Sequence, residues 1–228
     1  MKLKILVAGT GRCGSTYMAH LLTQMGLPCG HEAIFTTDGL EEAKKRLSKP
    51  ETIKFSECTE NSIPLWTEPW DIVADSSYLS APFLNHLLLK ETKIINVIRN
   101  PLEVIASYVF DAKYFTNDFP PITQKFQEFI KKHLPIVYDN NLDPINRTAL
   151  FYIEWNNLIK QNKNVFHFNV ESHPEVLANY LNVPCHVDVY KKINSWNHNK
   201  RPILSYSDIQ EPLRRQLKEF KYMQKLFL

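Results

Sequence analysis

Residues 9–16, Gly-Thr-Gly-Arg-Cys-Gly-Ser-Thr, combine several groups that bind anions. They follow a short apolar run and precede a helical pattern, so the glycines form a turn at the start of a helix. Such a turn exposes backbone N–H groups, and the helix dipole adds about half a positive charge there. Arg12 adds a planar cation, and Ser15 and Thr16 add hydroxyl donors. Gly11 and Gly14 would allow positive φ angles and a close approach of the backbone to an anion.

The spacing of these glycines is similar to that of a nucleotide-binding loop, G-x-x-x-x-G-K-[ST], but Ser15 stands where the lysine would be. That lysine reaches the terminal phosphates of ATP or GTP. A sulfuryl group carries less negative charge than a γ-phosphoryl group and need not be held by a metal. The loop therefore favours a phosphosulfate over a triphosphate. The structural alternative is a glycine turn that only closes a strand onto a helix.

A second cluster of polar residues follows the mainly apolar run Ile-Asn-Val-Ile at 95–98. We expect a buried strand to end at Arg99. Pro101 suits the first turn of a helix, and Ser107 lies two turns further on. An arginine fork and a hydroxyl together make a suitable clamp for a phosphate dianion. The structural alternative is an arginine in a surface turn followed by an unrelated helical serine.

Two candidates for a general base follow the first predicted helix, in the stretch Cys-Gly-His-Glu that begins at position 29. Both His31 and Glu32 are candidates. Glutamate is ionised at neutral pH, with a reference pKa of about 4.3, whereas histidine lies near about 6.5. Burial would raise the pKa of Glu32 towards a value useful for catalysis. The alternative for the pair is a polar entry into a strand.

Asp75, Ser76 and Ser77 close another apolar run. Open α/β sheets bind ligands at the carboxyl ends of their strands, so Asp75 and Ser76 are expected to face the acceptor. An apolar run followed by Asp is also typical of the carboxylate that holds Mg²⁺ in a P-loop kinase. A third interpretation makes Asp75 the cap of a helix that starts near residue 79.

Residues 11–17 and 95–108 together resemble the bacterial type of sulfotransferases that use 3′-phosphoadenosine 5′-phosphosulfate (PAPS). In this family the loop after the first strand holds the 5′-phosphosulfate and has a basic residue, a small residue, glycine, two hydroxyl residues and an aromatic residue. The matching residues here are Arg12, Cys13, Gly14, Ser15, Thr16 and Tyr17.

The resemblance implies a role for each matched residue. Arg99 and Ser107 bind the 3′-phosphate, a group that ATP lacks, and Tyr17 lies against adenine. Some branches of the family use histidine as the base, but in the bacterial type a His-Glu pair supplies glutamate, which favours Glu32. Cys13 departs from the more common serine. A thiol at a helix N-terminus can have a lowered pKa and be oxidisable.

The family also brings a basic loop from near the C-terminus over the cofactor phosphates. In this chain the polar stretch 193–202 contains Lys200 and Arg201, and the match is loose. We expect Arg201, and after it Lys200, to contact the cofactor. The alternative is that both side chains are only solvated.

Apolar runs that predict strands alternate with helical patterns along the chain, and this alternation is typical of an α/β domain. We predict one three-layer, P-loop NTPase-like domain over 1–228, with a mainly parallel central sheet flanked by helices. Its cofactor-binding core spans about 4–108, and acceptor-side and C-terminal helical elements span about 109–228. The aromatic-rich stretch 111–121 is either a lid or an ordinary surface connection. Strands are expected at 4–8, 52–55, 71–74, 93–98 and 164–170, and helices at 15–26, 79–91, 101–113, 122–134, 145–162, 174–182 and in the C-terminal tail.

The composition of the 228-residue chain excludes several classes of protein. A net charge of +3 is too small to indicate nucleic-acid binding. No apolar stretch approaches the roughly 20 residues that a membrane span requires. The four cysteines form no CxxC pair, which is typical of reduced thiols in a cytoplasmic protein.

These observations predict a PAPS-dependent sulfotransferase that moves a sulfuryl group to a hydroxyl or amine by metal-independent in-line transfer. Arg12 and the loop amides would hold the sulfate-bearing end of PAPS, and the acceptor would be a small molecule or glycan. The chain leaves the acceptor and the oligomeric state unidentified. Two alternatives stay open: a small-molecule kinase with Thr16 and Asp75 on Mg²⁺, and a non-catalytic nucleotide-binding module.

Overall fold

The computed structural model describes residues 2–49, 72–116, 123–138, 141–185 and 202–225, with side chains described as far as residue 220. Five strands form one sheet in the order β2-β3-β1-β4-β5, and all its strand pairs are parallel. This confirms the predicted α/β class. The strands are β1 (Ile5–Gly9), β2 (Cys29–His31), β3 (Ala74–Ser76), β4 (Lys93–Ile98) and β5 (Val165–Asn169).

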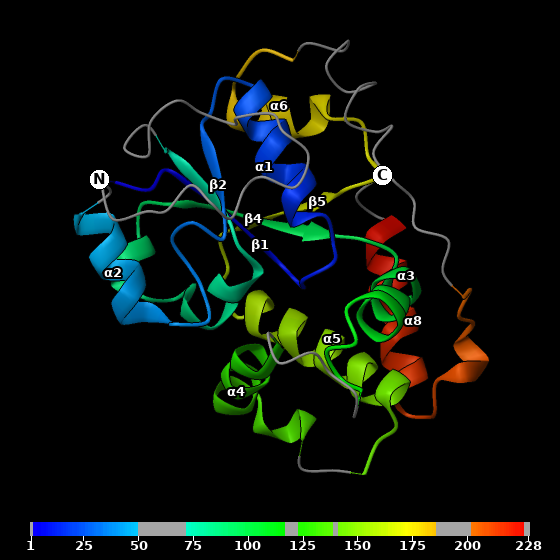
Figure 1. Cartoon of the computed structure of the whole chain (residues 1–228). Helices are drawn as coiled ribbons and strands as arrows, with labels where there is room; N and C mark the ends of the chain where they lie inside the picture. The colour runs from blue at the N-terminus through cyan, green and yellow to red at the C-terminus, as the bar shows by residue number, and fades with distance from the viewer. Residues whose placement is uncertain (1, 50–71, 117–122, 139–140, 186–201, 226–228) are drawn as a thin grey trace.

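Helices cover both faces of the sheet and give the predicted three layers (Figure 1). One face carries α1 and α6, and the other carries α4 and α5, with α3 and α8 packed against α5. The helices are α1 (Ser15–Gln24), α2 (Leu40–Ser48), α3 (Pro101–Ala106), α4 (Gln124–His133), α5 (Pro144–Lys160), α6 (Glu175–Leu181) and α8 (Leu213–Lys225).

Local sequence explains where the central elements begin. All five residues of β1 are buried, as expected of an inner strand covered on both faces. At α3 the Asn100 side chain accepts a hydrogen bond from the backbone N–H of Leu102, and Pro101 takes the first helical position. The predicted tail helix is also present, and its residues Leu213 and Leu217 are buried.

Some predicted elements differ from the structure. The predicted helix at 79–91 is wrong: two 3₁₀-helices, η4 (Tyr78–Phe83) and η5 (Leu87–Leu89), occupy it, and Pro82 lies inside the first. Proline removes a backbone donor and clashes with the preceding turn, which prevents a continuous α-helix. The strand predicted at 71–74 runs instead over Ala74–Ser76, and the one predicted at 52–55 lies outside the described residues.

Two other helical segments differ from the sequence predictions. α2 was not predicted from the sequence. The segment predicted as one helix at 101–113 is α3 followed by a π-helix, η6 (Ser107–Asp111). Single π-turns inside helices are frequent at functional sites. Two further 3₁₀-helices are η8 (Pro135–Val137) and η9 (Tyr206–Asp208).

Strand order fixes where a ligand can bind. β1 lies at the centre, with β3 on one side and β4 on the other. The chain therefore reverses its direction of winding at β1, and parallel sheets bind ligands at the carboxyl edge beside such a switch point. The glycine loop follows β1, Glu32 follows β2, Ser76 ends β3 and Arg99 follows β4. The candidate residues thus lie along one edge of the sheet.

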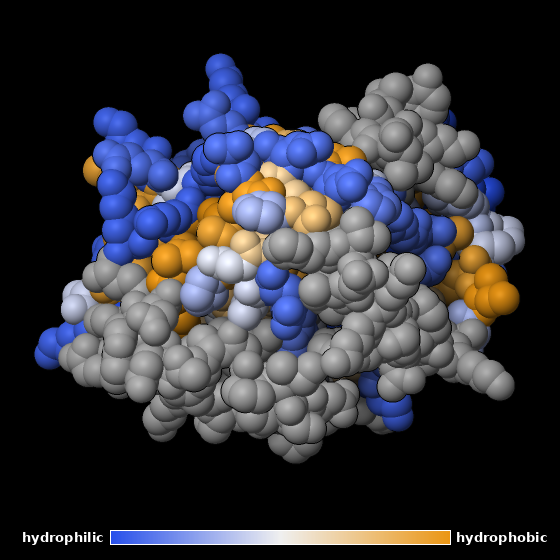
Figure 2. Space-filling model, turned by 90° about the horizontal axis from the view of Figure 1, so that it is seen from above, coloured by the Kyte–Doolittle hydropathy of each residue, from blue (hydrophilic) through white to orange (hydrophobic). Residues whose placement is uncertain are grey.

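The described surface is mainly hydrophilic on the face seen from above, with apolar residues gathered near its centre (Figure 2). Among the described residues, none of the helices is both long and apolar enough to cross a membrane.

Candidate active site

The glycine loop between β1 and α1 has two residues in the left-handed region, Arg12 at φ 65° and Gly14 at φ 107°. Gly14 uses the positive φ that glycine allows, whereas Gly11 does not. Glycine is required at position 11 for space, because a Cβ there would lie 2.1 Å from the hydroxyl oxygen of Tyr108. Left-handed backbone at a non-glycine residue costs about 1–2 kcal/mol and is often found at functional sites.

A tryptophan of α5 anchors the glycine loop. The indole N–H of Trp155 donates a hydrogen bond to the carbonyl oxygen of Gly9, at 3.0 Å. Within the loop, the Thr10 hydroxyl and the Cys13 thiol lie 2.6 Å apart. Burial raises the pKa of the Cys13 thiol to about 11, although the Thr10 hydrogen bond opposes the rise. The predicted low thiol pKa is therefore wrong, because Cys13 is 1% exposed and its thiolate would be desolvated.

Arg12 contacts the second predicted motif directly. Its Nε–H donates to the Ser107 hydroxyl oxygen at 2.8 Å, and that hydroxyl donates to Asp111 Oδ2 at 3.1 Å. Arg12 Nη2 lies 3.9 Å from the same carboxylate oxygen. Two predicted residues 95 positions apart are thus brought together, and Asp111 joins them.

Arg99 lies at the end of β4, as predicted. Its Nη2 is 2.6 Å from Glu103 Oε2, one turn along α3. The charge of Arg99 lowers the pKa of the Cys13 thiol, against the larger effect of burial, so the two predicted motifs converge on one region. The carbonyl oxygen of Arg99 accepts a hydrogen bond from the Tyr152 hydroxyl at 3.3 Å.

His31 and Glu32 lie at the end of β2, opposite the start of α1. His31 Nε2 is 3.0 Å from the Ser15 hydroxyl and 3.3 Å from the Thr16 hydroxyl. Burial lowers the pKa of His31 to about 4, with a smaller contribution from His20, so the imidazole is neutral at pH 7. Glu32 takes a left-handed backbone at φ 53°, and its carboxylate lies 3.9 Å from His31 Nε2.

Asp75 is fully buried, and its carboxylate accepts hydrogen bonds from the backbone N–H groups of Ala33, Ile34 and Phe35 at 3.0–3.2 Å. These bonds fix the turn after Glu32, and burial raises the pKa of Asp75 to about 6. This geometry corrects three expectations for Asp75: contact with the acceptor, coordination of Mg²⁺ and capping of a helix. That 3₁₀-helix has Ser77 as its N-cap.

Ser76 also has a structural partner. Its hydroxyl donates to the carbonyl oxygen of Ser15 at 2.7 Å, which ties the end of β3 to the start of α1. The side chain is buried, so it does not line an acceptor cavity in this geometry.

Three tyrosines lie close enough to Arg12 and Glu32 to interact with their charges, and they were not predicted as site residues. Burial raises the pKa values of Tyr78, Tyr108 and Tyr114, and the nearby Glu32 carboxylate raises them further. The Tyr108 hydroxyl is buried and has no hydrogen-bond partner among the described residues. The sequence carries one signal for it, since Tyr108 directly follows Ser107 in the second motif.

A family model described as "Sulfotransferase domain" matches residues 2–221. The chain belongs to the sulfotransferase family. A solved structure, the sulfotransferase from Alicyclobacillus acidocaldarius, is 15% identical and is matched over 96% of this chain and 91% of that one, with a TM-score of 0.42. No curated protein matches the sequence.

Three further residues of this sulfotransferase were predicted to contact the cofactor: Tyr17, Lys200 and Arg201. Tyr17 is half-buried on α1, and burial raises its pKa to about 12. Lys200 and Arg201 lie outside the described residues. The described part of the chain contains no group of three or more His, Cys, Asp or Glu residues that could hold a metal ion.

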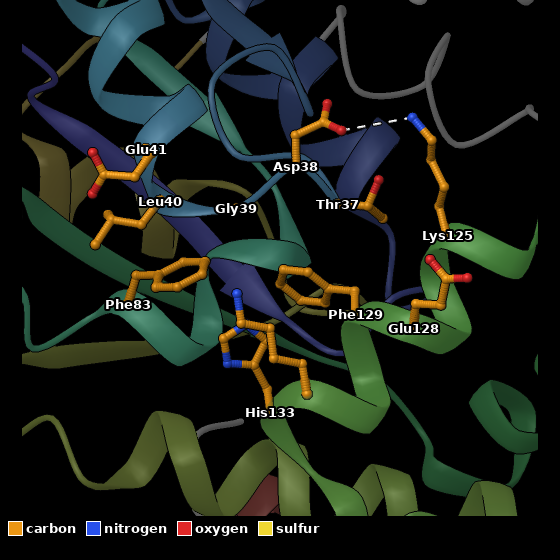
Figure 3. A pocket seen from close by; sticks show the side chains of 11 residues that line it. Thr37, Asp38, Gly39, Leu40, Glu41, Phe83, Lys125, Glu128, Phe129 and His133 are labelled. Carbon is orange, nitrogen blue, oxygen red and sulfur yellow. Dashed lines mark ion pairs between the residues drawn. The ribbon is translucent and has the colours of Figure 1, made fainter.

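A separate cavity of about 490 Å³ lies between the start of α2, η4 and α4 (Figure 3). The rings of Phe83, Phe129 and His133 lie together at its wall, with centroids 4.6–6.2 Å apart. Lys125 and Asp38 approach each other across its rim at 3.7 Å.

Proposed function

We propose that this sulfotransferase uses PAPS and transfers its sulfuryl group to a hydroxyl or amine of a small-molecule or glycan acceptor. The observation that carries the proposal is the contact between Arg12 and Ser107, with Arg99 nearby. It joins an anion-binding loop to a second cationic position at the switch point of the sheet. A nucleotide with anionic groups at both its 5′ and 3′ ends would engage both positions, whereas ATP lacks the 3′-phosphate.

The residues of the chain fit such a donor. The loop amides at the start of α1 and the guanidinium of Arg12 would bind the 5′ end and stabilise the charge that develops on the leaving phosphate. Arg99 and Ser107 would bind the 3′-phosphate, since a guanidinium fork and a hydroxyl both donate to phosphate oxygens. Gly11, Cys13 and Gly14 would shape the loop, and Tyr17 would lie against adenine. Arg201 and Lys200 stay candidate phosphate ligands.

Glu32 is the proposed base. In the transfer, the acceptor oxygen or nitrogen forms a bond to sulfur while the bond from sulfur to the bridging oxygen of the phosphate breaks. The acceptor proton goes to the Glu32 carboxylate. His31, with its pKa lowered to about 4, is a poor base at neutral pH and would instead orient Ser15 and Thr16.

The kinase alternative requires Asp75 to coordinate Mg²⁺, and its hydrogen bonds oppose that role. Both oxygens of Asp75 accept backbone N–H groups inside the protein, so neither is directed at a nucleotide. A P-loop kinase without its lysine and without this carboxylate would lack the charges that hold Mg²⁺ and the terminal phosphates.

Calorimetry with adenosine 3′,5′-bisphosphate, the product of PAPS, tests the donor. We expect tight binding without metal and weak binding of ATP with Mg²⁺. Arg99→Ala should weaken the bisphosphate far more than adenosine 5′-monophosphate, because only the bisphosphate has the 3′ group. Stronger binding of ATP with Mg²⁺, or equal losses for both adenosine ligands, would contradict the proposal.

A further inference from the structure

Arg12 and Arg99, the candidate arginines within the described residues, are each paired with a carboxylate from the segment 101–111. Arg99 lies 2.6 Å from Glu103, and Arg12 lies 3.9 Å from Asp111. The Glu103 side chain is 45% exposed and that of Asp111 is 21% exposed. The exposures of the arginines run the other way, at 21% for Arg99 and 38% for Arg12, so exposure does not rank the two ion pairs.

Asp111 also engages the hydroxyl that connects the two motifs. Ser107 accepts from Arg12 Nε and donates to Asp111 Oδ2, and the serine is 1% exposed. Ser107 and Asp111 are four residues apart on η6, so both are presented on one side of that helix. The carboxylate therefore accepts a hydrogen bond from the hydroxyl and lies near the guanidinium, and a phosphate or sulfate oxygen would use the same two donors.

We propose that Asp111 is an internal counter-ion that competes with the anionic groups of the nucleotide for Arg12 and Ser107. This inference rests on the proposed function, since it assumes that these two residues bind the nucleotide. A bound nucleotide displaces the carboxylate from both donors. When the nucleotide leaves, the carboxylate takes its place, which lowers the affinity for the bisphosphate product and speeds its release.

Asp111→Asn is the decisive variant, because it keeps the size and an acceptor for Ser107 while removing the charge. We expect it to bind adenosine 3′,5′-bisphosphate about fivefold more tightly, the factor expected for a partly exposed ion pair. The bisphosphate should also dissociate more slowly in stopped-flow displacement. Asp111→Glu should stay within about twofold of the wild type. Asp111→Ser provides a second uncharged variant, and thermal unfolding checks that each variant is folded.

Glu91→Gln is the matched control. It removes one negative charge next to Lys2, ahead of the first residue of β4, at the sheet edge opposite the loop. We expect this control to leave bisphosphate affinity unchanged, which separates a local effect of Asp111 from a change in net charge.

The outcomes separate the counter-ion inference from the proposed function on which it rests. Tighter binding by both uncharged variants supports the competing counter-ion. Unchanged or weaker binding by folded Asp111→Asn, while Arg12→Gln lowers affinity, would overturn the counter-ion and leave the proposed function standing. If neither the wild type nor any variant binds the bisphosphate, the proposed function fails and the inference fails with it.

Discussion

At the scale of single residues, Glu32 shares an uncommon left-handed backbone with Arg12. Its φ of 53° is left-handed, and its N–H donates to the carbonyl oxygen of Ser76 at 3.1 Å. Three N–H groups bound by Asp75 hold the residues that follow it. This conformation costs about 1–3 kcal/mol, and the surrounding hydrogen bonds maintain it. The backbone of the proposed base is therefore held in one conformation.

Glu32→Gln should reduce sulfuryl transfer by about 10²–10⁴-fold, the range expected for loss of a general base. Bisphosphate affinity should stay the same, because the amide keeps the shape of the carboxylate. Activity is measured by release of bisphosphate from PAPS with an acceptor panel. Glu41→Gln, on the exposed surface of α2, is the control and should keep full activity. Full activity in Glu32→Gln would assign the base to another residue.

Residue types could be predicted from the sequence better than their environments. The contact of Arg12 with Ser107 follows from two motifs that a parallel sheet brings to one edge. The burial of Cys13 and the backbone partners of Asp75 could not be predicted, because both depend on tertiary packing. Asp111 was overlooked, since a lone aspartate after a helix carries no local pattern.

At the scale of elements, the loop and η6 fit together through Gly11 and Tyr108. Gly11→Ala should destabilise the protein by about 1–3 kcal/mol through overpacking, because its Cβ would lie 2.1 Å from the Tyr108 hydroxyl oxygen. Urea unfolding measures the loss. It should also weaken bisphosphate binding, since the loop must shift to relieve the contact.

A double-mutant cycle with Tyr108→Phe provides the control. The phenol hydroxyl has no hydrogen-bond partner among the described residues, so Tyr108→Phe alone should change stability little. In the Gly11→Ala background it should restore part of the lost stability, because the shortest contact disappears while one of 3.1 Å to the ring remains. Simple additivity of the two changes would refute the steric explanation.

The elements themselves were predicted unevenly, and the reasons are physical. β4 was predicted with its observed limits, since a mainly apolar run, here buried from Ile94 to Ile98, has one favourable place in a parallel sheet. The segment 79–91 has helical spacing but includes Pro82, and tertiary packing gives it short 3₁₀ turns. α2 is short and mainly polar, with only Ala43 and Leu47 buried, so its pattern was weak.

At the scale of the whole molecule, His31 links stability to pH. Its folded pKa of about 4 lies below its ordinary value of 6.5, so the folded state favours the neutral imidazole. The stabilisation is complete above pH 6.5 and is lost as the pH falls towards 4. Over that range, wild-type protein should lose about 3 kcal/mol more free energy of unfolding than His31→Gln. Urea unfolding at several pH values measures the difference.

The titration of Asp75 changes the free energy of unfolding in the opposite direction to that of His31. The effect of His31 is therefore measured as the difference between the wild type and His31→Gln. The folded pKa of Asp75, raised to about 6, means that the folded state holds a proton which the unfolded state releases above its ordinary 3.8. Its contribution therefore increases stability as the pH falls from 6 to 3.8. Asp75 is present in both proteins, so its effect cancels in the difference. Parallel pH curves for the two proteins would refute the assigned burial of His31.

The central place of β1 also has a consequence for the kinetics of folding. β1 is made before its partners, which begin only at Ala74 and Lys93, and the loop anchor Trp155 comes later still. During synthesis an apolar strand therefore leaves the ribosome with both of its edges unpaired. Non-local parallel pairing is slow, and unpaired apolar edges promote aggregation. The strand that carries the anion-binding loop is thus also a segment that needs protection until Lys93–Ile98 has been made.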